Sequence, residues 1–361
     1  MKICIDIRPA LKSTSTGGGK FTLALVNALT PLADYELILY YKKSFFDFKK
    51  RCPRVKGSNV SYFNAGGDNL PQADIYITSC YDFIPPQSGK LVFIMYDLIP
   101  VVVPELSSSD AGEILLKSLP DMLRRADAVV CISENTKNDL VKFYSPVENK
   151  IKVIYPVIDS GYKQINDKEY LRKRLKKIGV SNEYLLFVSS IEPRKNLLNL
   201  LKAFSKVKEK FPKMKLVAAG KSVKSYRDVE EYMKVYEFKD DVIFSGYVKQ
   251  EDLVYLYNGA EVFIFPSFYE GFGLPIAEAF SCGTAVVTSN ASSMKEAAGG
   301  AAVLVDPYSP GSISEGIMRI LADKDYKEEL IDYGLKRAKD FNPDRIGNEY
   351  RKLFEDILKR I

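Results

Sequence analysis

The sequence contains no histidine, so chemistry that depends on an imidazole group is excluded. Histidine is the usual general base near neutral pH and a common ligand of zinc. Without it the chain cannot be a hydrolase with a Ser–His–Asp triad, a papain-like enzyme, or a hydrolase whose zinc is held by histidines. These classes are removed before any pattern is considered.

Cysteine and long apolar runs are scarce too. The five cysteines are odd in number, lie far apart and form no C-x-x-C pair, which supports neither a disulfide framework nor a zinc ribbon and is typical of a reducing compartment. No apolar run approaches the roughly 18 residues needed to span a bilayer. The first residues have the pattern of a strand, not of a signal peptide. We therefore expect a cytoplasmic protein.

The overall composition is typical of a globular protein. Of its 361 residues, 27% are charged and 12% aromatic, and the formal net charge is +6. The length favours two domains over a single core. A mildly basic balance does not by itself identify a partner.

Short apolar runs rich in Val, Ile, Tyr and Phe recur along the chain in two series. The first comprises residues 2–8, 35–41, 75–78, 91–96, 128–133 and 151–156. The second comprises residues 184–189, 215–220, 242–247, 261–266, 285–290 and 301–306. Segments with helical spacing lie between them, among them 21–29, 197–207 and 253–257. Because the runs are continuous, they indicate strands buried on both faces, as in parallel sheets covered by helices.

The number of apolar runs is larger than the eight strands of a single β/α barrel. We therefore predict an α/β fold of two doubly wound domains. The seam is expected at residues 156–167, before a basic helix at 168–177. The N-terminal domain would span residues 1–160 and the C-terminal domain residues 161–343. Ligands of open α/β sheets bind beyond the carboxyl ends of the strands, so the strand-end loops are the candidates for function.

The loop after residues 261–266 is the richest of these. It contains two glycines, followed by Pro275 at a position typical of a helix start. The amides near Gly273 and Leu274 would form an anion site suited to a diphosphate. Glu278 could accept hydrogen bonds from ribose hydroxyls, and Glu270 would face the strand end. The simpler alternative is that Glu270 caps a turn and Glu278 is a solvated helix residue.

Glu270 and Glu278, with seven residues between them, resemble the E-x7-E motif of the family 4 retaining glycosyltransferases. The surrounding residues from Phe265 to Pro307 resemble that family almost throughout: FPSFYEGFGLPIAEAFSCGTAVVTSNASSMKEAAGGAAVLVDP. The resemblance extends over nearly the whole chain. It implies the GT-B architecture, two Rossmann-like domains facing across a cleft, and it implies that residues 344–361 return as a helix to complete the N-terminal domain.

The resemblance also implies roles for the residues of this loop. Glu270 would orient the hydroxyls of the transferred sugar and so count among the catalytic residues. The donor would be bound by Gly271, Phe272, Gly273, Leu274 and Glu278.

A second element is Glu-Pro-Arg-Lys-Asn at residues 192–196, again between a strand and a helix. Two adjacent cations there suit a pyrophosphate, Arg194 as a bidentate donor and Lys195 as a point charge. The resemblance implies the same phosphate-binding and catalytic role for both. A purely structural role is disfavoured, because cations at a helix N-terminus oppose the helix dipole unless an anion is present.

The N-terminal domain begins with Asp6-Ile7-Arg8, followed by Gly17, Gly18 and Gly19. The pattern resembles the family's D-x-R and its Gly-rich loop, which implies that the glycines close over the donor diphosphate. Taken alone, three glycines indicate only a flexible loop.

Two further strand ends match the family more loosely. Asp97 is assigned to the catalytic site by the match, and it follows Tyr96, where relatives typically have a histidine close to the reacting sugar. A phenol can hydrogen-bond a sugar hydroxyl, but it cannot act as an imidazole base. Ser133 resembles the first residue of an S-x-x-T pattern on the acceptor side, although a helix N-cap is the simpler interpretation.

Two other signals are discounted. Asp323 and Asp325 form a D-x-D pattern known from metal-dependent glycosyltransferases, but they lie between helical segments, where acidic residues commonly cap, and we expect a turn there and no metal site. The stretch 40–56, from Tyr40 to Lys56, mixes basic and aromatic residues. It suits the inner face of an anionic membrane or an anionic acceptor, with a solvated helix face as an equal alternative. Nucleic acid is not expected.

We therefore predict a retaining, metal-independent glycosyltransferase without a cofactor. It would move a hexose, with mannose favoured, from a nucleotide-sugar (GDP- or UDP-linked) to a glycan or lipid-linked acceptor in surface polysaccharide biosynthesis. The alternative is a catalytically weak GT-B subunit that binds nucleotide or stabilises an active transferase, which Tyr96 motivates. A dehydrogenase with two Rossmann domains is disfavoured, since no G-x-G-x-x-G follows a strand and no histidine is present.

Overall fold

The computed structural model of the chain describes residues 1–12, 17–42, 54–65, 70–86, 88–107, 109–180, 183–221 and 227–359. The chain divides into two compact units, each built on one parallel sheet. Unit 1 comprises Met1–Asp159 and Phe341–Ile361, and unit 2 comprises Ser160–Asp340. The seam was predicted at residues 156–167 and the return of the chain at residue 344, and the units divide at residues 159/160 and 340/341.

Unit 1 contains a seven-stranded sheet in the order β3-β2-β1-β4-β5-β6-β7, with parallel pairing throughout. Its interior strands are almost wholly buried, as the continuous apolar runs predicted. The strands are β1 (Lys2–Asp6), β2 (Glu36–Tyr41), β3 (Val60–Asn64), β4 (Ile75–Thr78), β5 (Lys90–Met95), β6 (Ala128–Cys131) and β7 (Ile151–Val153).

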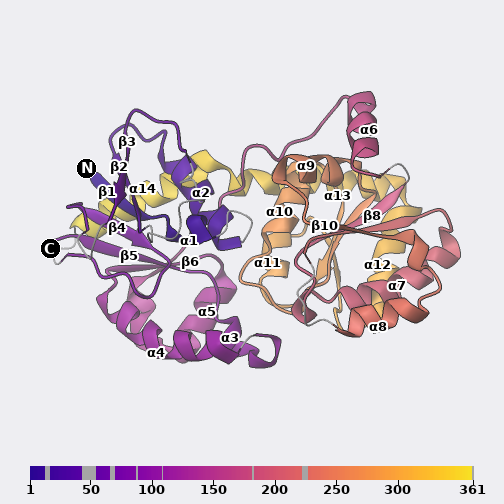
Figure 1. Cartoon of the computed structure of the whole chain (residues 1–361), viewed down its shortest axis with the longest axis horizontal. Coiled ribbons are helices and arrows are strands. Elements are labelled where there is room, and N and C mark those ends of the chain that lie inside the picture. The colour runs from indigo at the N-terminus through magenta and orange to yellow at the C-terminus, as the bar shows by residue number, and fades with distance from the viewer. Residues whose placement is uncertain are drawn as a thin grey trace. The chain divides into compact units, whose positions relative to one another are not determined.

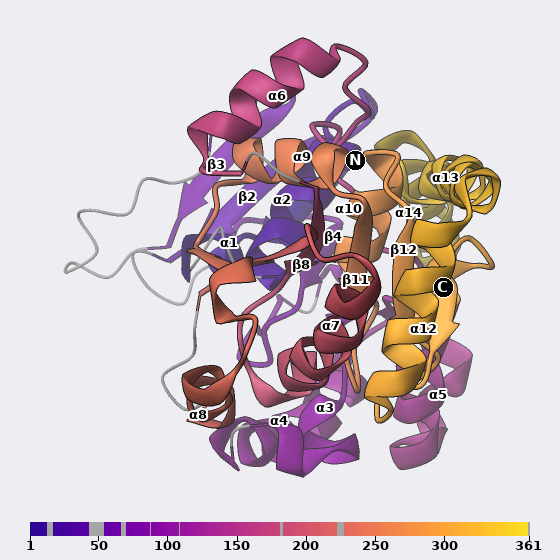
Figure 2. The same ribbon diagram turned by 90° about the vertical axis from the view of Figure 1, so that its right-hand side faces the viewer.

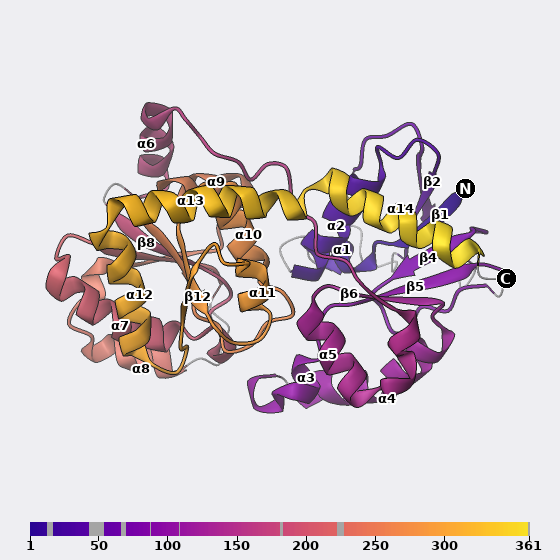
Figure 3. The ribbon, with the colours of Figure 1, turned by 180° about the vertical axis from the view of Figure 1, so that it is seen from behind.

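Helices cover both faces of this sheet, with α2 and α14 on one face and α4 and α5 on the other (Figures 1 and 3). Helix α14 packs along α2 and buries five large side chains on one side: Ile346, Tyr350, Leu353, Phe354 and Ile357. The predicted helix at 344–361 is therefore present in unit 1. The helices are α1 (Arg8–Lys12), α2 (Gly17–Leu29), α3 (Ile99–Val102), α4 (Ser109–Arg125), α5 (Glu134–Phe143) and α14 (Pro343–Lys359).

Unit 2 contains a six-stranded sheet in the order β10-β9-β8-β11-β12-β13, again parallel throughout. Every residue of β8 and β11 is buried. The strands are β8 (Tyr184–Val188), β9 (Lys215–Ala219), β10 (Val242–Gly246), β11 (Val262–Phe265), β12 (Val286–Ser289) and β13 (Val303–Val305).

The helices of unit 2 also form two layers, with α7, α8 and α12 on one face of the sheet and α9, α10 and α13 on the other (Figures 1 and 2). They are α6 (Lys168–Lys177), α7 (Leu197–Lys210), α8 (Arg227–Val235), α9 (Gln250–Gly259), α10 (Leu274–Ser281), α11 (Met294–Ala298), α12 (Pro310–Ala322) and α13 (Lys324–Ala338).

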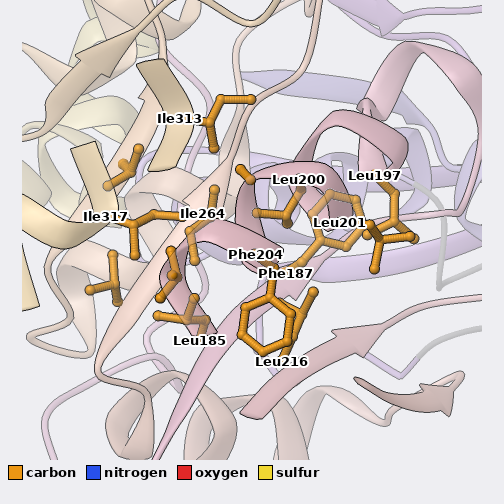
Figure 4. Close-up of a cluster of buried hydrophobic side chains, with 14 of the residues drawn as sticks. Leu185, Phe187, Leu197, Leu200, Leu201, Phe204, Leu216, Ile264, Ile313 and Ile317 are labelled. Carbon is orange, nitrogen blue, oxygen red and sulfur yellow. The ribbon is translucent and has the colours of Figure 1, made fainter. Parts of the chain in front are cut away.

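The core under α7 and α12 holds unit 2 together (Figure 4). Leu200 and Phe204 of α7 and Ile313 of α12 are fully buried against the side chains of β8, β9 and β11. Close packing of these residues fixes the first turn of α7, and therefore the loop that precedes it, against the carboxyl end of β8.

Two expectations need correction. Strand β3 was not predicted, because it lies at the sheet edge and its residues Val60–Asn64 are mostly half-buried or exposed, without a continuous apolar run. Gly17, Gly18 and Gly19 were predicted to form a loop, but Gly17 begins α2 and the three glycines form its first turn. The Thr22 hydroxyl donates to the Gly18 carbonyl at 2.8 Å, one turn along this helix.

Candidate functional site

The strand order of unit 2 reverses between β8 and β11, which are neighbours in space although β9 and β10 separate them in sequence. Open α/β sheets bind ligands beyond the carboxyl ends of their strands at such a reversal. Arg194 and Lys195 follow β8, and Glu270 follows β11. The fold thus brings together the main residues that the two strand-end motifs contributed.

These three side chains form one ion-paired cluster. Lys195 Nζ donates to Glu270 Oε1 at 2.5 Å, and Arg194 Nη1 lies 2.7 Å from Glu270 Oε2. Both carboxylate oxygens of Glu270 are therefore engaged by cations. Arg194 also donates from Nη2 to Glu192 Oε1 at 2.9 Å, and from Nη1 to the Tyr269 carbonyl at 2.7 Å. Two cations and two carboxylates balance in formal charge.

The backbone around the cluster is fixed by short polar contacts. Asn196 has a left-handed backbone (φ 62°), and its amide group donates to the carbonyls of Pro266 and Pro307 at 2.9 and 2.7 Å. Ser292 and Ser293 both donate to the carbonyl of Glu270, at 2.7 and 2.8 Å. The loops after β8, β11, β12 and β13 are thereby tied to one another, so the cluster rests on four strands.

Burial and ion pairing have opposite effects on the pKa values of Glu270 and Lys195. Burial raises the pKa of Glu270, but Lys195 and Arg194 more than offset it and hold that pKa below its ordinary value. Burial lowers the pKa of Lys195, Arg194 lowers it further, and the attraction of Glu270 compensates only in part. Glu270 is thus kept as a carboxylate, unsuited to act as a general acid at neutral pH.

The remaining residues that the sequence predicts to bind the donor lie around the start of α10. Gly273 has φ 99° as the N-cap residue, a conformation that L side chains rarely adopt, and the helix begins at Leu274 with Pro275 in its first turn. Gly271 and Phe272 are buried just before it. The predicted strand–turn–helix with its glycine turn is therefore present.

Glu278 lies one turn into α10. It is 6% exposed, so it is not the solvated residue of the simpler alternative. The Tyr257 hydroxyl donates to Glu278 Oε2 at 2.9 Å. Burial and the nearby Glu278 charge raise the pKa of Tyr257 well above its usual range, so the phenol keeps its proton and acts as the donor.

In unit 1 the strand order reverses between β1 and β4, and a second buried cluster lies there. Arg8 donates to both oxygens of Asp6, from Nε to Oδ1 at 2.9 Å and from Nη2 to Oδ2 at 2.8 Å. The Thr78 hydroxyl at the end of β4 donates to Asp6 Oδ2 at 2.8 Å. The D-x-R pattern thus forms an internal bidentate pair, and Arg8 also contacts Asp82 at 2.9 Å.

Tyr96 lies at the end of β5, beside the first turn of α2. Its ring packs edge-on against Phe21 at 5.1 Å between centroids, and a Cβ on Gly18 would lie 3.5 Å from its Cε2. Burial raises the pKa of Tyr96 to about 12, and Ser79 and Thr22 lower it by less. The phenol therefore remains protonated at neutral pH. Asp97, the next residue, accepts at Oδ1 from the Ile99 amide at 3.1 Å.

Ser133 has the simpler of its two predicted roles in the structure. It is the N-cap of α5, and its hydroxyl accepts from the Thr136 amide at 2.9 Å. Asp323 is likewise an N-cap, accepting from the Tyr326 amide at 2.9 Å, as the expectation of a turn implied. Of the stretch 40–56, residues 43–53 lie outside the described residues.

Sequence reasoning missed several residues that hold the candidate residues of each unit in place. Tyr257 on α9 and the pair Ser292–Ser293 after β12 carry no recognisable pattern, because their partners Glu278 and Glu270 lie far along the chain. Thr78 at the end of β4 could have been found as a polar residue ending a buried strand. Only the strand order within each sheet brings these residues beside their partners.

Two features are absent from the residues that the structure describes. No group of three or more acidic, cysteine or histidine side chains there could hold a metal ion. None of the described helices combines the length and the apolar character that crossing a bilayer requires.

Known proteins resemble this chain both in sequence and in fold. Residues 169–337 match the family model described as glycosyl transferases group 1. The O-antigen chain mannosyltransferase B of Escherichia coli is 28% identical over an alignment 375 residues long. The alignment covers 95% of this chain and 96% of that relative.

Two solved structures resemble the whole chain. Sucrose-phosphate synthase from Thermosynechococcus elongatus matches with a TM-score of 0.80 at 19% identity, over 100% of both chains. HepE of Anabaena in complex with UDP and glucose matches with a TM-score of 0.74 at 17% identity, over 99% of this chain and 100% of its own. The predicted fold, two Rossmann-like parallel-sheet domains of the GT-B class, is confirmed.

Proposed function

We propose that this glycosyltransferase, whose residues 169–337 match the model of the glycosyl transferases group 1, transfers a hexose, with mannose favoured, from a nucleotide-sugar to a glycan or lipid-linked acceptor. We further propose that transfer retains the anomeric configuration and needs no metal ion or cofactor. The observation that carries the proposal is the Arg194–Lys195–Glu270 cluster at the strand reversal of unit 2.

The cluster supports phosphate binding by its donors. An ammonium group has three N–H donors, and the bond to Glu270 uses one of those of Lys195. A diphosphate placed beyond β8 and β11 would meet Lys195, Arg194 and the start of α10, where negative charge is stabilised. These donors would stabilise the charge that develops on the leaving phosphate in the transition state.

Retention without a protein nucleophile fits the state of Glu270. Retaining glycosidases use a free carboxylate that attacks the sugar carbon, but both oxygens of Glu270 are bound by cations and its pKa is lowered. Such a carboxylate is a weak nucleophile and a good hydrogen-bond acceptor. We therefore assign it to orienting sugar hydroxyls, with substitution on the front face and the leaving phosphate taking the proton of the acceptor hydroxyl.

The remaining assignments follow the residues. Glu278, held by Tyr257, would accept from the ribose hydroxyls, and Gly271, Phe272, Gly273 and Leu274 would line the donor site. Gly17, Gly18 and Gly19, with their amides in the first turn of α2, would face the donor phosphates. Tyr96 would hydrogen-bond a sugar hydroxyl as a neutral phenol, with Asp97 beside it, and Ser133 would lie on the acceptor side.

The choice of sugar and acceptor draws on the similar proteins. The Escherichia coli relative is described as an O-antigen chain mannosyltransferase, which favours mannose and surface polysaccharide synthesis. The solved HepE structure holds UDP and glucose, which keeps a UDP-sugar as the second donor candidate.

Nucleotide binding is the first test. Thermal unfolding should shift upward with one of UDP, GDP, ADP, CDP or dTDP, since a ligand at about 100 times its dissociation constant adds roughly 2.7 kcal/mol. Glu278→Gln should lose most of the shift, and Glu261→Gln, outside the site, should keep it. A chain that no nucleotide stabilises would contradict the proposal and favour the alternative of a catalytically weak partner subunit, which Tyr96 motivates.

Transfer itself is the second test. GDP-mannose and UDP-glucose are offered with a mannoside acceptor, with and without EDTA, and the product anomer is read by NMR. Retained configuration and unchanged rate in EDTA are expected. Inverted configuration, or loss of activity restored by a divalent cation, would contradict the mechanism while leaving transfer itself intact.

A further inference from the structure

Helix α6 projects from unit 2 and is attached through one face only (Figures 1 and 2). Leu171 and Leu175 are buried. The guanidinium of Arg174 lies 4.6 Å from the ring of Tyr255 on α9. The hydroxyls of Tyr170 and Tyr255 are 3.0 Å apart. Residues 170, 171, 174 and 175 therefore hold the helix on unit 2.

The opposite half of α6 is almost entirely cationic. Successive residues of a helix are about 100° apart, so the positions opposite the attached face are 168, 169, 172, 173, 176 and 177. All of them are exposed: Lys168, Glu169, Arg172, Lys173, Lys176 and Lys177. Five cations and one carboxylate thus share one face of a ten-residue helix.

The acidic residues at the start of α6 are already engaged. Asp167 caps the helix by accepting from the Tyr170 amide at 2.9 Å, and Glu169 pairs with Lys173 at 2.6 Å. In the part of the chain that the structure describes, Arg172, Lys176 and Lys177 have no ion pair. Their charge is therefore available to a partner.

The spacing of these charges disfavours an isolated surface helix. Lys168 and Arg172, Arg172 and Lys176, and Lys173 and Lys177 are like-charged pairs four residues apart, and such pairs destabilise a helix. A cation or two in the last turn would be explained by the helix dipole. Five basic residues between 172 and 177 exceed that need, and an anionic partner would relieve their repulsion.

We propose that this face of α6 docks on the anionic surface of a phospholipid membrane. The cations form a convex stripe about 15 Å long, which suits a field of headgroup phosphates rather than one enclosed anion. Clusters of four to eight Lys and Arg residues on one surface are attracted in this way to anionic leaflets. The assignment goes beyond the proposed transfer reaction and does not depend on the stretch 40–56, most of which lies outside the described residues.

The test uses the full-length chain and sedimentation with vesicles. Vesicles containing phosphatidylglycerol are compared with vesicles of phosphatidylcholine alone, in low and high salt. The triple variant Arg172→Gln/Lys176→Gln/Lys177→Gln removes the cations that have no partner. Each basic residue near an anionic surface strengthens binding by about fivefold, so the triple should bind roughly 100-fold more weakly.

A matched control comes from α7, on the other face of the sheet. Lys202→Gln/Lys206→Gln/Lys210→Gln removes the same charge from exposed positions four residues apart, and it should bind anionic vesicles like the wild type. Equal loss of vesicle binding in the α6 and α7 triple variants, or no vesicle binding by the wild type, would overturn the proposal. So would α6-dependent binding to heparin without binding to vesicles, because the partner would then be a soluble polyanion.

The docking of α6 on a membrane and the proposed transfer reaction can be contradicted independently of each other. With a water-soluble acceptor, the α6 triple should keep wild-type activity, because none of the side-chain contacts of α6 within the described part of unit 2 involves Arg194, Lys195 or Glu270. Loss of vesicle binding with retained transfer supports the docking surface. Absence of transfer in every form of the protein would contradict the reaction alone.

Discussion

Glu270 is enclosed between Lys195 and Arg194, and its role can be tested by removing only its charge. Breaking a buried pair leaves the remaining charges uncompensated, which costs about 3–5 kcal/mol. Glu270→Gln should lower the free energy of unfolding by about that amount, measured by urea denaturation with far-UV circular dichroism. It should also lower the pKa of Lys195 further, since burial and Arg194 remain.

Glu192→Gln is the matched control for that substitution. Glu192 contacts the same Arg194, but its side chain is 30% exposed. Partly solvated pairs of this kind contribute up to about 1 kcal/mol, so a small change is expected. If both variants lost the same stability, burial of Glu270 would not be the cause.

The same carboxylate predicts how stability depends on pH. The pKa of Glu270 in the folded chain lies below its ordinary value of 4.5, so the unfolded chain takes up a proton first as pH falls. The stabilisation is complete above pH 4.5 and is lost as pH falls through the folded pKa. Unfolding free energies of wild type and Glu270→Gln should therefore converge in acid. A difference that stayed constant from pH 7 to pH 3.5 would contradict this sign.

At the scale of elements, the contact between α2 and α14 depends on Gly347. A Cβ there would lie 2.7 Å from the carbonyl oxygen of Ala28, a backbone atom that cannot rotate away. Alanine favours a helix interior by about 1 kcal/mol, but overpacking costs about 1–3 kcal/mol, so Gly347→Ala should destabilise the chain. Thermal unfolding measures the sign.

Gly311→Ala in α12 serves as the comparison. Its Cβ would meet no atom closer than 3.5 Å. It should be neutral or stabilising by up to about 1 kcal/mol, because it restricts the unfolded chain. Destabilisation of the same size at both glycines would show that the clash with Ala28 is not responsible.

The elements also show which parts of the fold the sequence could predict. Strands such as β4 and β8 are buried on both faces, and their continuous apolar runs identified them. Edge strand β3 lacks such a run. The first turn of α2 was read as a loop because glycine has low helix propensity, and local propensity does not report the packing of Gly18 beside Tyr96.

The sequence could name the residues of the candidate site, but it could not predict their contacts. Arg194, Lys195 and Glu270 stood out because they follow buried strands beside a proline or a glycine, and Glu278 because it lies one turn into the helix that begins at the glycine turn. The pairing of Lys195 with Glu270, 75 residues apart, depends on β8 and β11 being neighbours. Strand order is a property of the whole sheet, and no local pattern encodes it.

At the scale of the whole molecule, each unit has its own core. The destabilisation caused by a core substitution should therefore be confined mainly to the unit that carries it. Phe354 on α14 is fully buried between Tyr350 and Tyr35, at 5.9 Å from each ring. Phe204 is fully buried in the core of unit 2. Replacing either by alanine costs about 3–5 kcal/mol. Hydrogen exchange should speed up mainly in unit 1 for Phe354→Ala and mainly in unit 2 for Phe204→Ala. Equal acceleration throughout both units in either variant would contradict independent cores.

The return of the chain to unit 1 through α14 also determines the order of events during translation. Domains generally fold as they emerge from the ribosome, the first-made before the next. Here the residues of unit 2 are complete at Asp340, whereas unit 1 still lacks Tyr350, Phe354 and the rest of the buried face of α14. The half of the protein that is begun first is therefore finished last, and until then α2 exposes to chaperones the apolar surface that α14 will cover.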